Sequence, residues 1–401
     1  MLCRSASYQG LGGPVWSIRA LLKQQGSHPL PNYSFTGVLC DGVFRSYSEL
    51  TDSRLKTSRK SLIPPSLSYI EQAAISVPSL LRSINSAVGQ SRNQILLHCH
   101  DFVSAYLCRR RFGRRYPLLL TIHAKGGGVR ELLVDYPVLR RTPIAWMARH
   151  IETSAVRWAD TVAFPSAGAR DLFSAEHPGL LGEKEVRIVH AGIDAEDILS
   201  VPDDKTIRQK YGVPEDRHLL LSIAAMVQDK GLDTLVEAIG MLPTKVLSHS
   251  SCLIVAREGP LKPQLESIIA KYKLQGNVRL LGFLPRRDMV QLLKQSDLFV
   301  LPSRVAIFDV VLLEAALSGA PVVTSTVGGN IEMFDKESAF LIPCDSPSIL
   351  AETIMRALSN RALCQQISTN AKKRVLESFS LESLSRSYIM LYKEMLSAWH
   401  G

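Results

Sequence analysis

The sequence predicts an α/β protein with two domains, each built around a parallel β-sheet. Its 401 residues exceed what one hydrophobic core usually holds, because domains mostly run to about 100–200 residues. The composition, 46% hydrophobic and 21% charged, is ordinary for a globular protein. Short apolar runs alternate with helix-like stretches along most of the chain. Runs of this kind form strands buried on both faces, and their alternation with helices predicts β-α-β crossovers.

The expected strands are short and mostly apolar. They are Ile95–Leu97, Leu118–Ile122, Thr161–Phe164, Val186–Val189, His218–Ile223, Cys252–Val255, Leu298–Leu301 and Pro321–Thr324. Helices are expected at Leu232–Leu242, Leu261–Tyr272, Arg287–Gln295 and Val310–Leu317, with Gly319 as a left-handed cap after the last of them. Residues 24–90 have scattered Pro and Ser, and they predict no topology.

A candidate linker divides the chain. The segment Ala195–Gln209 lacks a sustained period and contains a Val-Pro-Asp-Asp run, after which the strand pattern restarts. We therefore expect a first domain at residues 1–200 and a second at residues 201–380. Residues 381–401 follow with an amphipathic helix pattern from Leu381 to Trp399.

The charge is basic and unevenly distributed. The formal net charge is +10, and residues 101–150 hold ten Lys/Arg against three acids. This block is either a solvated basic face or a contact for an anionic partner such as a phosphate-bearing substrate, a nucleic acid or an acidic lipid surface. Few aromatic residues accompany the Arg109–Arg115 run (Phe112 and Tyr116), which disfavours nucleic acid.

The cysteines indicate a reducing compartment. All seven stand singly, without the spacing of a zinc site or of a small disulfide-stabilised scaffold, so we expect reduced thiols, no metal and a cytoplasmic protein. No apolar stretch of about 18 residues occurs to span a bilayer, so any membrane contact would be peripheral.

Three glycine-rich turns are candidates for phosphate or sugar contact. They are Gly10–Pro14, which includes Gly12 and Gly13; Ala124–Gly128, after His123; and Thr326–Glu332, which includes Gly328 and Gly329. A double glycine is more often a plain turn. The second and third nevertheless follow predicted parallel strands, at the carboxyl ends where α/β proteins bind ligands.

Residues 219–332 resemble the retaining nucleotide-sugar glycosyltransferases of the GT-B fold, family-4 type, also called glycosyl transferases group 1. The matching segments are Ala224–Leu232, Glu258–Leu261, Val278–Pro285, Ser296–Arg304, Phe308–Ala315, Ser318–Val323 and Val327–Gly329. In the first half, Gly12-Gly13, His98–Asp101, Leu120–His123 and Gly192–Asp194 fit the same family. The resemblance implies two Rossmann-like domains that face each other across a cleft, with the C-terminal helix crossing back to the first.

The resemblance also implies roles for individual residues. Lys230 would contact the donor diphosphate as a catalytic cation, Glu314 would bind the hydroxyls of the nucleotide ribose, and His123 would lie near the donor sugar. Gly12, Gly13, Gly328, Gly329 and Asn330 would complete the donor site. The structural alternatives are a surface lysine, a glutamate favoured by the helix dipole and a buried, satisfied histidine.

The sequence departs from the family pattern at several positions. Ala225 stands where an arginine normally joins the lysine, and Ala306 stands where the first of two glutamates is expected. Asp309 is the nearest carboxylate to replace that glutamate, and Arg257 or Arg304 could replace the arginine. Some subgroups carry Phe-Asp together with Gly-Gly-Asn, which fits Phe308-Asp309 and Gly328-Gly329-Asn330. The segment before the first glycine turn leaves almost no room for a first strand.

The expected activity is transfer of a sugar from a nucleotide diphosphate sugar to an acceptor, with retention and without a metal. A role in polysaccharide, lipopolysaccharide or glycolipid assembly is expected, with the Arg109–Arg115 run near anionic lipid at the inner face of the membrane. The main alternative is a degenerate homologue that acts as a binding partner or scaffold. An epimerase or phosphorylase with the same layout is less favoured, because no motif supports either.

Overall fold

The computed structural model describes residues 94–135, 137–256 and 258–399, together with Leu2–Cys3, Val38–Leu39 and Asn85. The chain divides into two compact units. Unit 1 comprises Met1–Gly192 and Leu381–Gly401, and unit 2 comprises Ile193–Ser380. The predicted ligands Gly12 and Gly13, and the candidate cation Arg257, lie outside the described residues.

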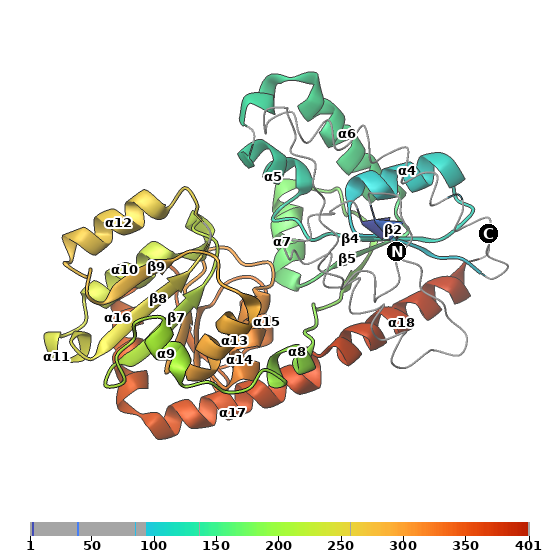
Figure 1. The fold of residues 1–401 in the computed structure, drawn as a ribbon. Helices are drawn as coiled ribbons and strands as arrows, with labels where there is room; N and C mark the ends of the chain where they lie inside the picture. Colours follow the sequence, from blue (N-terminus) through green and yellow to red (C-terminus); the bar gives the residue numbers. More distant parts are fainter. Residues whose placement is uncertain are drawn as a thin grey trace. The chain divides into compact units, whose positions relative to one another are not determined.

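Unit 1 is built on a six-stranded sheet in the order β2-β1-β3-β4-β5-β6. Figure 1 labels β2, β4 and β5 of this sheet. Its strands are β1 (Leu2–Cys3), β2 (Val38–Leu39), β3 (Leu97–Cys99), β4 (Leu118–Thr121), β5 (Thr161–Phe164) and β6 (Glu185–Ile188). Every pairing is parallel. The N-terminal segment, where almost no room for a strand was expected, supplies the two-residue β1 between β2 and β3.

Helices cover both faces of this sheet. They are α4 (Phe102–Phe112), α5 (Gly128–Asp135), α6 (Pro143–Trp158), α7 (Ala167–Glu176) and α18 (Leu381–Ala398), with a 3-10 helix η1 at Pro137–Arg141. Helix α18 packs Leu384, Tyr388 and Leu391 into one buried cluster with Leu119 of β4 and Ala163 of β5. The C-terminal helix therefore belongs to the first unit, as the family resemblance implies.

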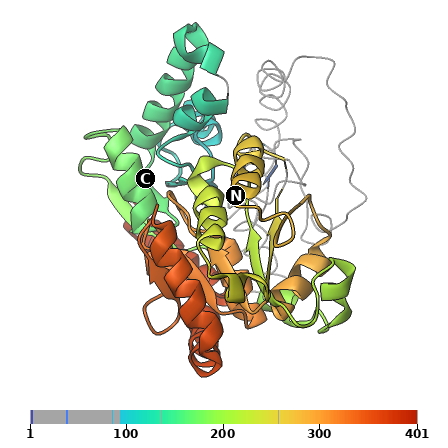
Figure 2. The same cartoon turned by 90° about the vertical axis from the view of Figure 1, so that its left-hand side faces the viewer.

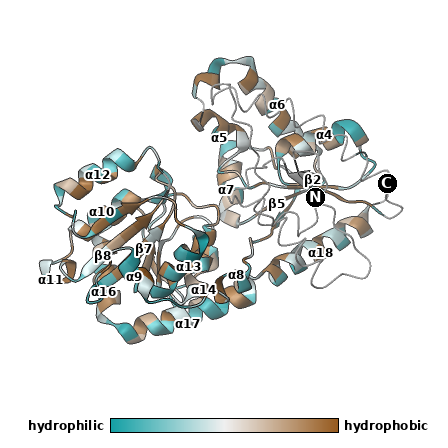
Figure 3. Ribbon diagram, viewed as in Figure 1, coloured by the Kyte–Doolittle hydropathy of each residue, from teal (hydrophilic) through white to brown (hydrophobic). Residues whose placement is uncertain are grey.

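Unit 2 is a second six-stranded parallel sheet in the order β12-β11-β10-β7-β8-β9. Its strands are β7 (His218–Ile223), β8 (Ser250–Val255), β9 (Val278–Leu281), β10 (Leu298–Leu301), β11 (Val322–Ser325) and β12 (Phe340–Ile342). They are strongly apolar (Figure 3). β9 and β12 were not among the expected strands.

The helices of unit 2 lie on both faces of its sheet (Figure 2). They are α8 (Ala195–Leu199), α9 (Thr206–Lys210), α10 (Leu232–Gly240), α11 (Thr244–Leu247), α12 (Lys262–Lys271), α13 (Arg286–Gln295), α14 (Val310–Ser318), α15 (Asn330–Met333), α16 (Pro347–Ser359) and α17 (Arg361–Ser378), with η2 at Gln228–Lys230. Gly319 caps α14 at a φ of 85°, as predicted. The expected linker contains α8 and α9, whose Ile198 and Ile207 are buried in the core of unit 2.

The strand order of unit 2 reverses between β7 and β10. From β7 the chain proceeds outward through β8 and β9, and it then returns to the other side of β7 for β10, β11 and β12. In open α/β sheets, ligands bind beyond the carboxyl ends of the strands at such a reversal. The loops after β7, β10 and β11 are therefore the place to look for a site.

Candidate functional site

The loops that follow three adjacent strands of unit 2 bring their polar side chains together. Lys230 ends η2 after β7, Asp309 precedes α14 after β10, and Asn330 begins α15 after β11. The Lys230 ammonium donates to Asp309 Oδ1. Asn330 Nδ2 donates to Asp309 Oδ2 over 3.1 Å. Three predicted donor ligands thus form one cluster at the strand-order reversal.

Asp309 is the centre of this cluster. Its Oδ2 also accepts a hydrogen bond from Ser303 Oγ at 2.8 Å, and its side chain is 7% exposed. Burial alone would raise the pKa of this carboxyl, but Lys230, Ser303 and Asn330 together outweigh the burial and lower the pKa. Asp309 is therefore a buried, ionised group that holds Lys230 in place. Its two oxygens accept three hydrogen bonds from protein groups, one on Oδ1 and two on Oδ2.

Two glycines let the loops approach closely enough for these contacts. Gly328 has a φ of +48°, and a Cβ atom there would lie 1.8 Å from the carbonyl oxygen of Ala306. Gly231, after Lys230, has a φ of +62°, and a Cβ atom there would lie 2.1 Å from the carbonyl oxygen of Pro302. Only glycine fits such positions. The N–H of Gly329 donates to the Ala306 carbonyl over 3.2 Å, so the main chain at Ala306 supports the predicted glycine turn.

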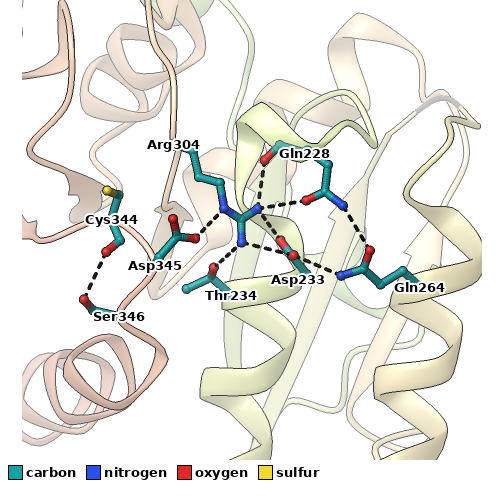
Figure 4. A network of polar contacts seen from close by, with 8 residues as sticks. All are labelled: Gln228, Asp233, Thr234, Gln264, Arg304, Cys344, Asp345 and Ser346. Atoms are coloured by element: carbon teal, nitrogen blue, oxygen red, sulfur yellow. Dashed lines mark hydrogen bonds and ion pairs between the residues drawn. The ribbon is translucent and has the colours of Figure 1, made fainter.

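Arg304 is fully engaged by protein groups (Figure 4). Its guanidinium donates to both carboxylate oxygens of Asp233 at 2.7 and 3.1 Å, to Asp345, and to the carbonyl of Gln228 at 2.8 Å. Its main-chain N–H donates to the carbonyl of Asp229 over 2.8 Å. Arg304 is thus a clamp on the loop that carries Lys230, and the suggestion that it replaces the family's missing arginine on the diphosphate is not supported by its contacts.

Glu314 lies in the middle of α14 and has a different partner. Arg286, the first residue of α13, donates to Glu314 Oε1 at 2.8 Å. Burial raises the pKa of Glu314, and Arg286 only partly opposes that effect. The Nε and one terminal nitrogen of Arg286 are buried without a hydrogen-bond partner among the described residues. A cation with unused donors beside a carboxylate can receive an anionic or hydroxyl-rich ligand.

Arg286 was not singled out from the sequence, although a signal was present. A cation in the first turn of a helix opposes the helix dipole, which favours acidic side chains there. Such a placement calls for a nearby carboxylate or anion. Here Glu314 is the carboxylate, at 2.8 Å, and Asp197 lies 3.6 Å from the second terminal nitrogen.

His123 belongs to a histidine cluster in unit 1, at the carboxyl ends of β3 and β4. His123 Nε2 and His100 Nδ1 are 3.0 Å apart, and the His98 and His100 rings lie 4.1 Å apart. His98 bonds to Tyr392 Oη and to Thr121 Oγ1, each at 2.7 Å. Burial lowers the pKa of His123 to about 4 and also lowers the pKa values of His98 and His100, so the cluster is neutral near pH 7.

The histidine bonds indicate a tautomer for His123. His100 Nε2 is buried without a partner among the described residues. A buried N–H group without an acceptor is rarer than a buried acceptor without a donor. The proton of His100 therefore belongs on Nδ1, which then donates to His123 Nε2. His123 in turn carries its own proton on Nδ1, so it can donate a hydrogen bond from that atom but is too weakly basic to serve as a general base near pH 7.

The glycine turn after His123 is already occupied by a protein carboxylate. The N–H groups of Gly128 and Val129 donate to Glu152 at 3.0 and 2.9 Å. A Cβ atom at Gly127 would lie 2.6 Å from the same carboxylate. Glu152 therefore takes the anion position at the start of α5, and the suggestion that this turn binds phosphate is not supported by its contacts.

The basic run at Arg109–Arg115 is divided by the structure. Arg109 is buried: it donates to the carbonyls of Trp158, Gly113 and Tyr116 and pairs with Asp160. Arg110, Arg111, Arg114 and Arg115 are exposed. Arg109 holds the end of α4 to the start of β5. Because its side chain is buried there, Arg109 is not part of the exposed surface that the rest of the run presents. Among the described residues, no helix is long and apolar enough to cross a bilayer.

Two family models match the chain, one on each half. The model "Glycosyltransferase Family 4" matches residues 46–197, and the model "Glycosyl transferases group 1" matches residues 203–374. The second match contains Lys230, Asp309, Glu314 and the Gly328–Asn330 turn, and the first contains the histidine cluster.

Curated proteins and solved structures are also similar to the chain. An uncharacterised glycosyltransferase of Methanocaldococcus jannaschii is 29% identical over 53% of this chain and 54% of its own length, so the match spans about half of that relative. The N-acetyl-alpha-D-glucosaminyl L-malate synthase of Bacillus anthracis is 24% identical over 79% of each chain. The structure of Anabaena Alr3699/HepE in complex with UDP and glucose superposes with a TM-score of 0.68 at 18% identity, covering 99% of both chains. This last likeness concerns the fold.

Proposed function

The chain belongs to the family-4-type glycosyltransferases of the GT-B fold, and on this premise we propose that it transfers a sugar from a nucleotide diphosphate sugar to an acceptor with retention of configuration. The observation that carries the proposal is the meeting of Lys230, Asp309 and Asn330 at the strand-order reversal of unit 2. A cation held there by a buried carboxylate is placed for the phosphates of a donor. The complex of Anabaena Alr3699/HepE with UDP supports a nucleotide donor.

In this proposal, unit 2 binds the nucleotide through two groups. Glu314 accepts the ribose hydroxyls, with Arg286 fixing its carboxylate at 2.8 Å. Lys230 donates to the diphosphate and stabilises the charge that develops on the leaving phosphate. A charge-assisted hydrogen bond of this kind contributes about 1.5–3 kcal/mol. Because Lys230 already pairs with Asp309, the diphosphate must share the ammonium with that carboxylate.

The chemical step breaks the bond between the anomeric carbon and the phosphate oxygen and forms a bond from that carbon to an acceptor oxygen on the same face. The acceptor's proton passes to the departing phosphate. No metal is required, because Lys230 supplies the positive charge. His123 of unit 1 offers a hydrogen bond from Nδ1 to a substrate, and positioning with electrostatic stabilisation supplies most of the catalysis. We place the activity at the inner face of a membrane, in polysaccharide, lipopolysaccharide or glycolipid assembly.

Nucleotide release from a panel of UDP-, GDP- and ADP-sugars tests the proposal. We expect one donor class to be hydrolysed slowly and to be consumed faster when an acceptor mixture is added. The matched variants are Lys230→Met, which removes the cation, and Lys262→Met, which removes an exposed lysine that pairs with Glu258 in the same unit. Lys230→Met should lose turnover and Lys262→Met should not. Absence of turnover with every donor, by a protein that melts cooperatively, contradicts the proposal.

A second candidate function is a non-catalytic homologue that serves as a binding partner. It is favoured by the same ion pair, because Asp309 neutralises Lys230 without any ligand, and by Ala306, which provides no carboxylate. Calorimetry with UDP, GDP and ADP separates the two candidates. Binding of none of them would favour the partner role.

A further inference from the structure

Two tyrosines of the C-terminal helix α18 place their hydroxyl groups inside unit 1. Tyr388 and Tyr392 are four residues apart, so they lie on one face of the helix, and their ring centroids are 5.9 Å apart. Both belong to the buried cluster that α18 forms with Leu119 of β4 and Ala163 of β5, and neither is more than 5% exposed. A hydroxyl buried in this way costs free energy unless it is hydrogen-bonded.

The two hydroxyls converge on His98 of β3. Tyr392 Oη lies 2.7 Å from His98 Nδ1, and Thr121 Oγ1 lies 2.7 Å from His98 Nε2. Tyr388 Oη lies 3.2 Å from the same Thr121 Oγ1. The Tyr388 and Tyr392 rings also pack on the imidazole, with centroids 4.9 and 5.7 Å away. Both polar atoms of the His98 ring are therefore used, and the ring cannot turn without breaking two hydrogen bonds.

His98 is in contact with the rest of the histidine cluster. His98 and His100 are two positions apart on an extended segment, so their side chains lie on one face, and their ring centroids are 4.1 Å apart. His100 Nδ1 is 3.0 Å from His123 Nε2, and these two rings are stacked. A continuous series of contacts thus runs from Tyr392 through His98 and His100 to His123.

Packing of α18 does not require these hydroxyls. Leu384, Leu391 and Met395 of the same helix are buried in the same cluster and supply apolar area. A phenylalanine at position 388 or 392 would fill nearly the same space and would have no polar group to desolvate. A hydrogen-bonded polar network in a core instead selects one arrangement of its members. The arrangement selected here is that of the His98 ring, against which His100 packs.

We propose that Tyr392, supported by Tyr388 through Thr121, is a positioning residue for His123. The inference rests on the proposed function, in which His123 offers a hydrogen bond from Nδ1 to a substrate. It adds that α18 is part of the machinery that orients this bond. All of the residues in the series belong to unit 1, so the loss of a tyrosine hydroxyl should leave nucleotide binding by unit 2 unchanged.

The first test compares two variants that each lose one tyrosine hydroxyl. Tyr392→Phe should lower kcat about tenfold while the KM for the donor stays unchanged, because misplacement of a group by about 1 Å can cost about 100-fold in rate. The matched control is Tyr211→Phe in unit 2, whose hydroxyl donates to Asp288 at 2.6 Å. It should lower the Tm but leave kcat at the wild-type value. Equal kcat values for Tyr392→Phe and wild type, or an equal loss in Tyr211→Phe, would overturn the proposal.

A double-mutant cycle tests whether the hydroxyl acts through His98. His98→Leu should itself lower kcat, and adding Tyr392→Phe to it should cause no further loss, because the hydroxyl then has no histidine to hold. Independent, multiplying losses in the double variant would show that Tyr392 acts by another route, and the proposed series of contacts would be wrong.

Nitrogen-15 NMR of the histidine rings gives a result that does not depend on turnover. At pH 7.5, His123 in wild type should show one protonated and one unprotonated ring nitrogen, as expected for a fixed tautomer. Tyr392→Phe should average or broaden these His123 signals, and Tyr211→Phe should not. Unchanged His123 signals in Tyr392→Phe would overturn the proposal. If wild type turns over no donor, the proposed function fails, and the NMR comparison still decides whether the tyrosine hydroxyl orders His123.

Discussion

Replacing Asp309 by asparagine removes the anion at the centre of the candidate donor site. The carboxylate accepts from Lys230 on one oxygen and from Ser303 and Asn330 on the other. An amide has one acceptor oxygen, so its NH2 group must face either the ammonium or the two neutral donors. Loss of one partner of a fully buried pair costs about 3–5 kcal/mol, whereas an exposed pair contributes about 0–1 kcal/mol. With the two side chains 17% and 7% exposed, we expect a loss of about 2–4 kcal/mol.

Thermal unfolding measures this loss. For a unit of this size, about 1 kcal/mol corresponds to about 2–4 °C, so Asp309→Asn should lower the Tm of unit 2 by about 5–15 °C. The control is Glu258→Gln, which removes an exposed partner of Lys262 in the same unit and should leave the Tm unchanged. A nucleoside diphosphate that binds should raise the Tm of Asp309→Asn more than that of wild type, because it gives Lys230 a new anionic partner.

The pH dependence follows from the lowered pKa of Asp309. A carboxyl whose pKa is lower in the folded state stabilises the fold above its ordinary value of about 4, and this stabilisation is lost as the pH falls through the native pKa. The difference between wild type and Asp309→Asn should therefore be complete at pH 7 and should shrink in acid below about pH 4. A Tm change no larger than that of Glu258→Gln, or a difference that grows in acid, would refute the central role of Asp309.

Three further predictions concern other parts of the two sites. Because burial raises the pKa of Glu314, nucleotide affinity should begin to fall with acid at a pH above 4.3, roughly the ordinary pKa of a glutamate. In calorimetry at pH 7.5, Glu314→Gln should bind the nucleotide about tenfold more weakly, and its affinity should lose that pH dependence. Unchanged affinity removes the ribose assignment. His100→Leu should lower kcat about tenfold or more with nucleotide affinity unchanged, whereas His100→Asn, whose amide replaces Nδ1, should retain most of the activity. Because the pKa of His123 is about 4, the pH–rate profiles of wild type and His100→Asn should show no inflection near pH 6.5. Equal rates for the two variants would contradict the tautomer argument. Gly328→Ala should destabilise unit 2 by more than about 2 kcal/mol, because its Cβ would lie 1.8 Å from a carbonyl oxygen. The control, Gly319→Ala, is also at positive φ but has no atom within 4 Å of its Cβ, and it should cost only about 1 kcal/mol. Similar Tm values for the two variants would show that the close approach does not matter.

The central strands and the family could be predicted from the sequence because they depend on local composition. Buried parallel strands such as Leu298–Leu301 read as continuous apolar runs, and the loops after them carry the residues that match the family. β9 and β12 were not predicted, and both lie at the edges of the sheet of unit 2. The helices of the expected linker were missed because α8 and α9 are five residues each, too short to show a period.

The partners of the site residues could not be predicted, because they lie far apart in the sequence. Lys230 and Asp309 are 79 positions apart, and Arg286 and Glu314 are 28 apart. One signal was present: Phe308-Asp309 and Gly328-Gly329-Asn330 occur together in some subgroups, and here Asn330 donates to Asp309. The hydrogen bond between Asn330 and Asp309 gives a physical reason for the Phe-Asp and Gly-Gly-Asn motifs to occur together. No feature of the sequence indicated that Glu152 accepts hydrogen bonds from the Gly126–Gly128 turn, because a buried glutamate on a helix has the same sequence pattern as an exposed one.

The account depends most on the claim that Lys230, held by Asp309, binds the diphosphate of a nucleotide donor. Calorimetric titration of wild type and Lys230→Met with UDP, GDP and ADP tests it directly. We predict that one nucleotide binds wild type at one site per chain. We also predict that Lys230→Met binds that nucleotide about 10- to 150-fold more weakly, the equivalent of one charge-assisted hydrogen bond of about 1.5–3 kcal/mol. Equal affinities of wild type and Lys230→Met, or no binding of any of the three nucleotides by the folded wild type, would contradict it.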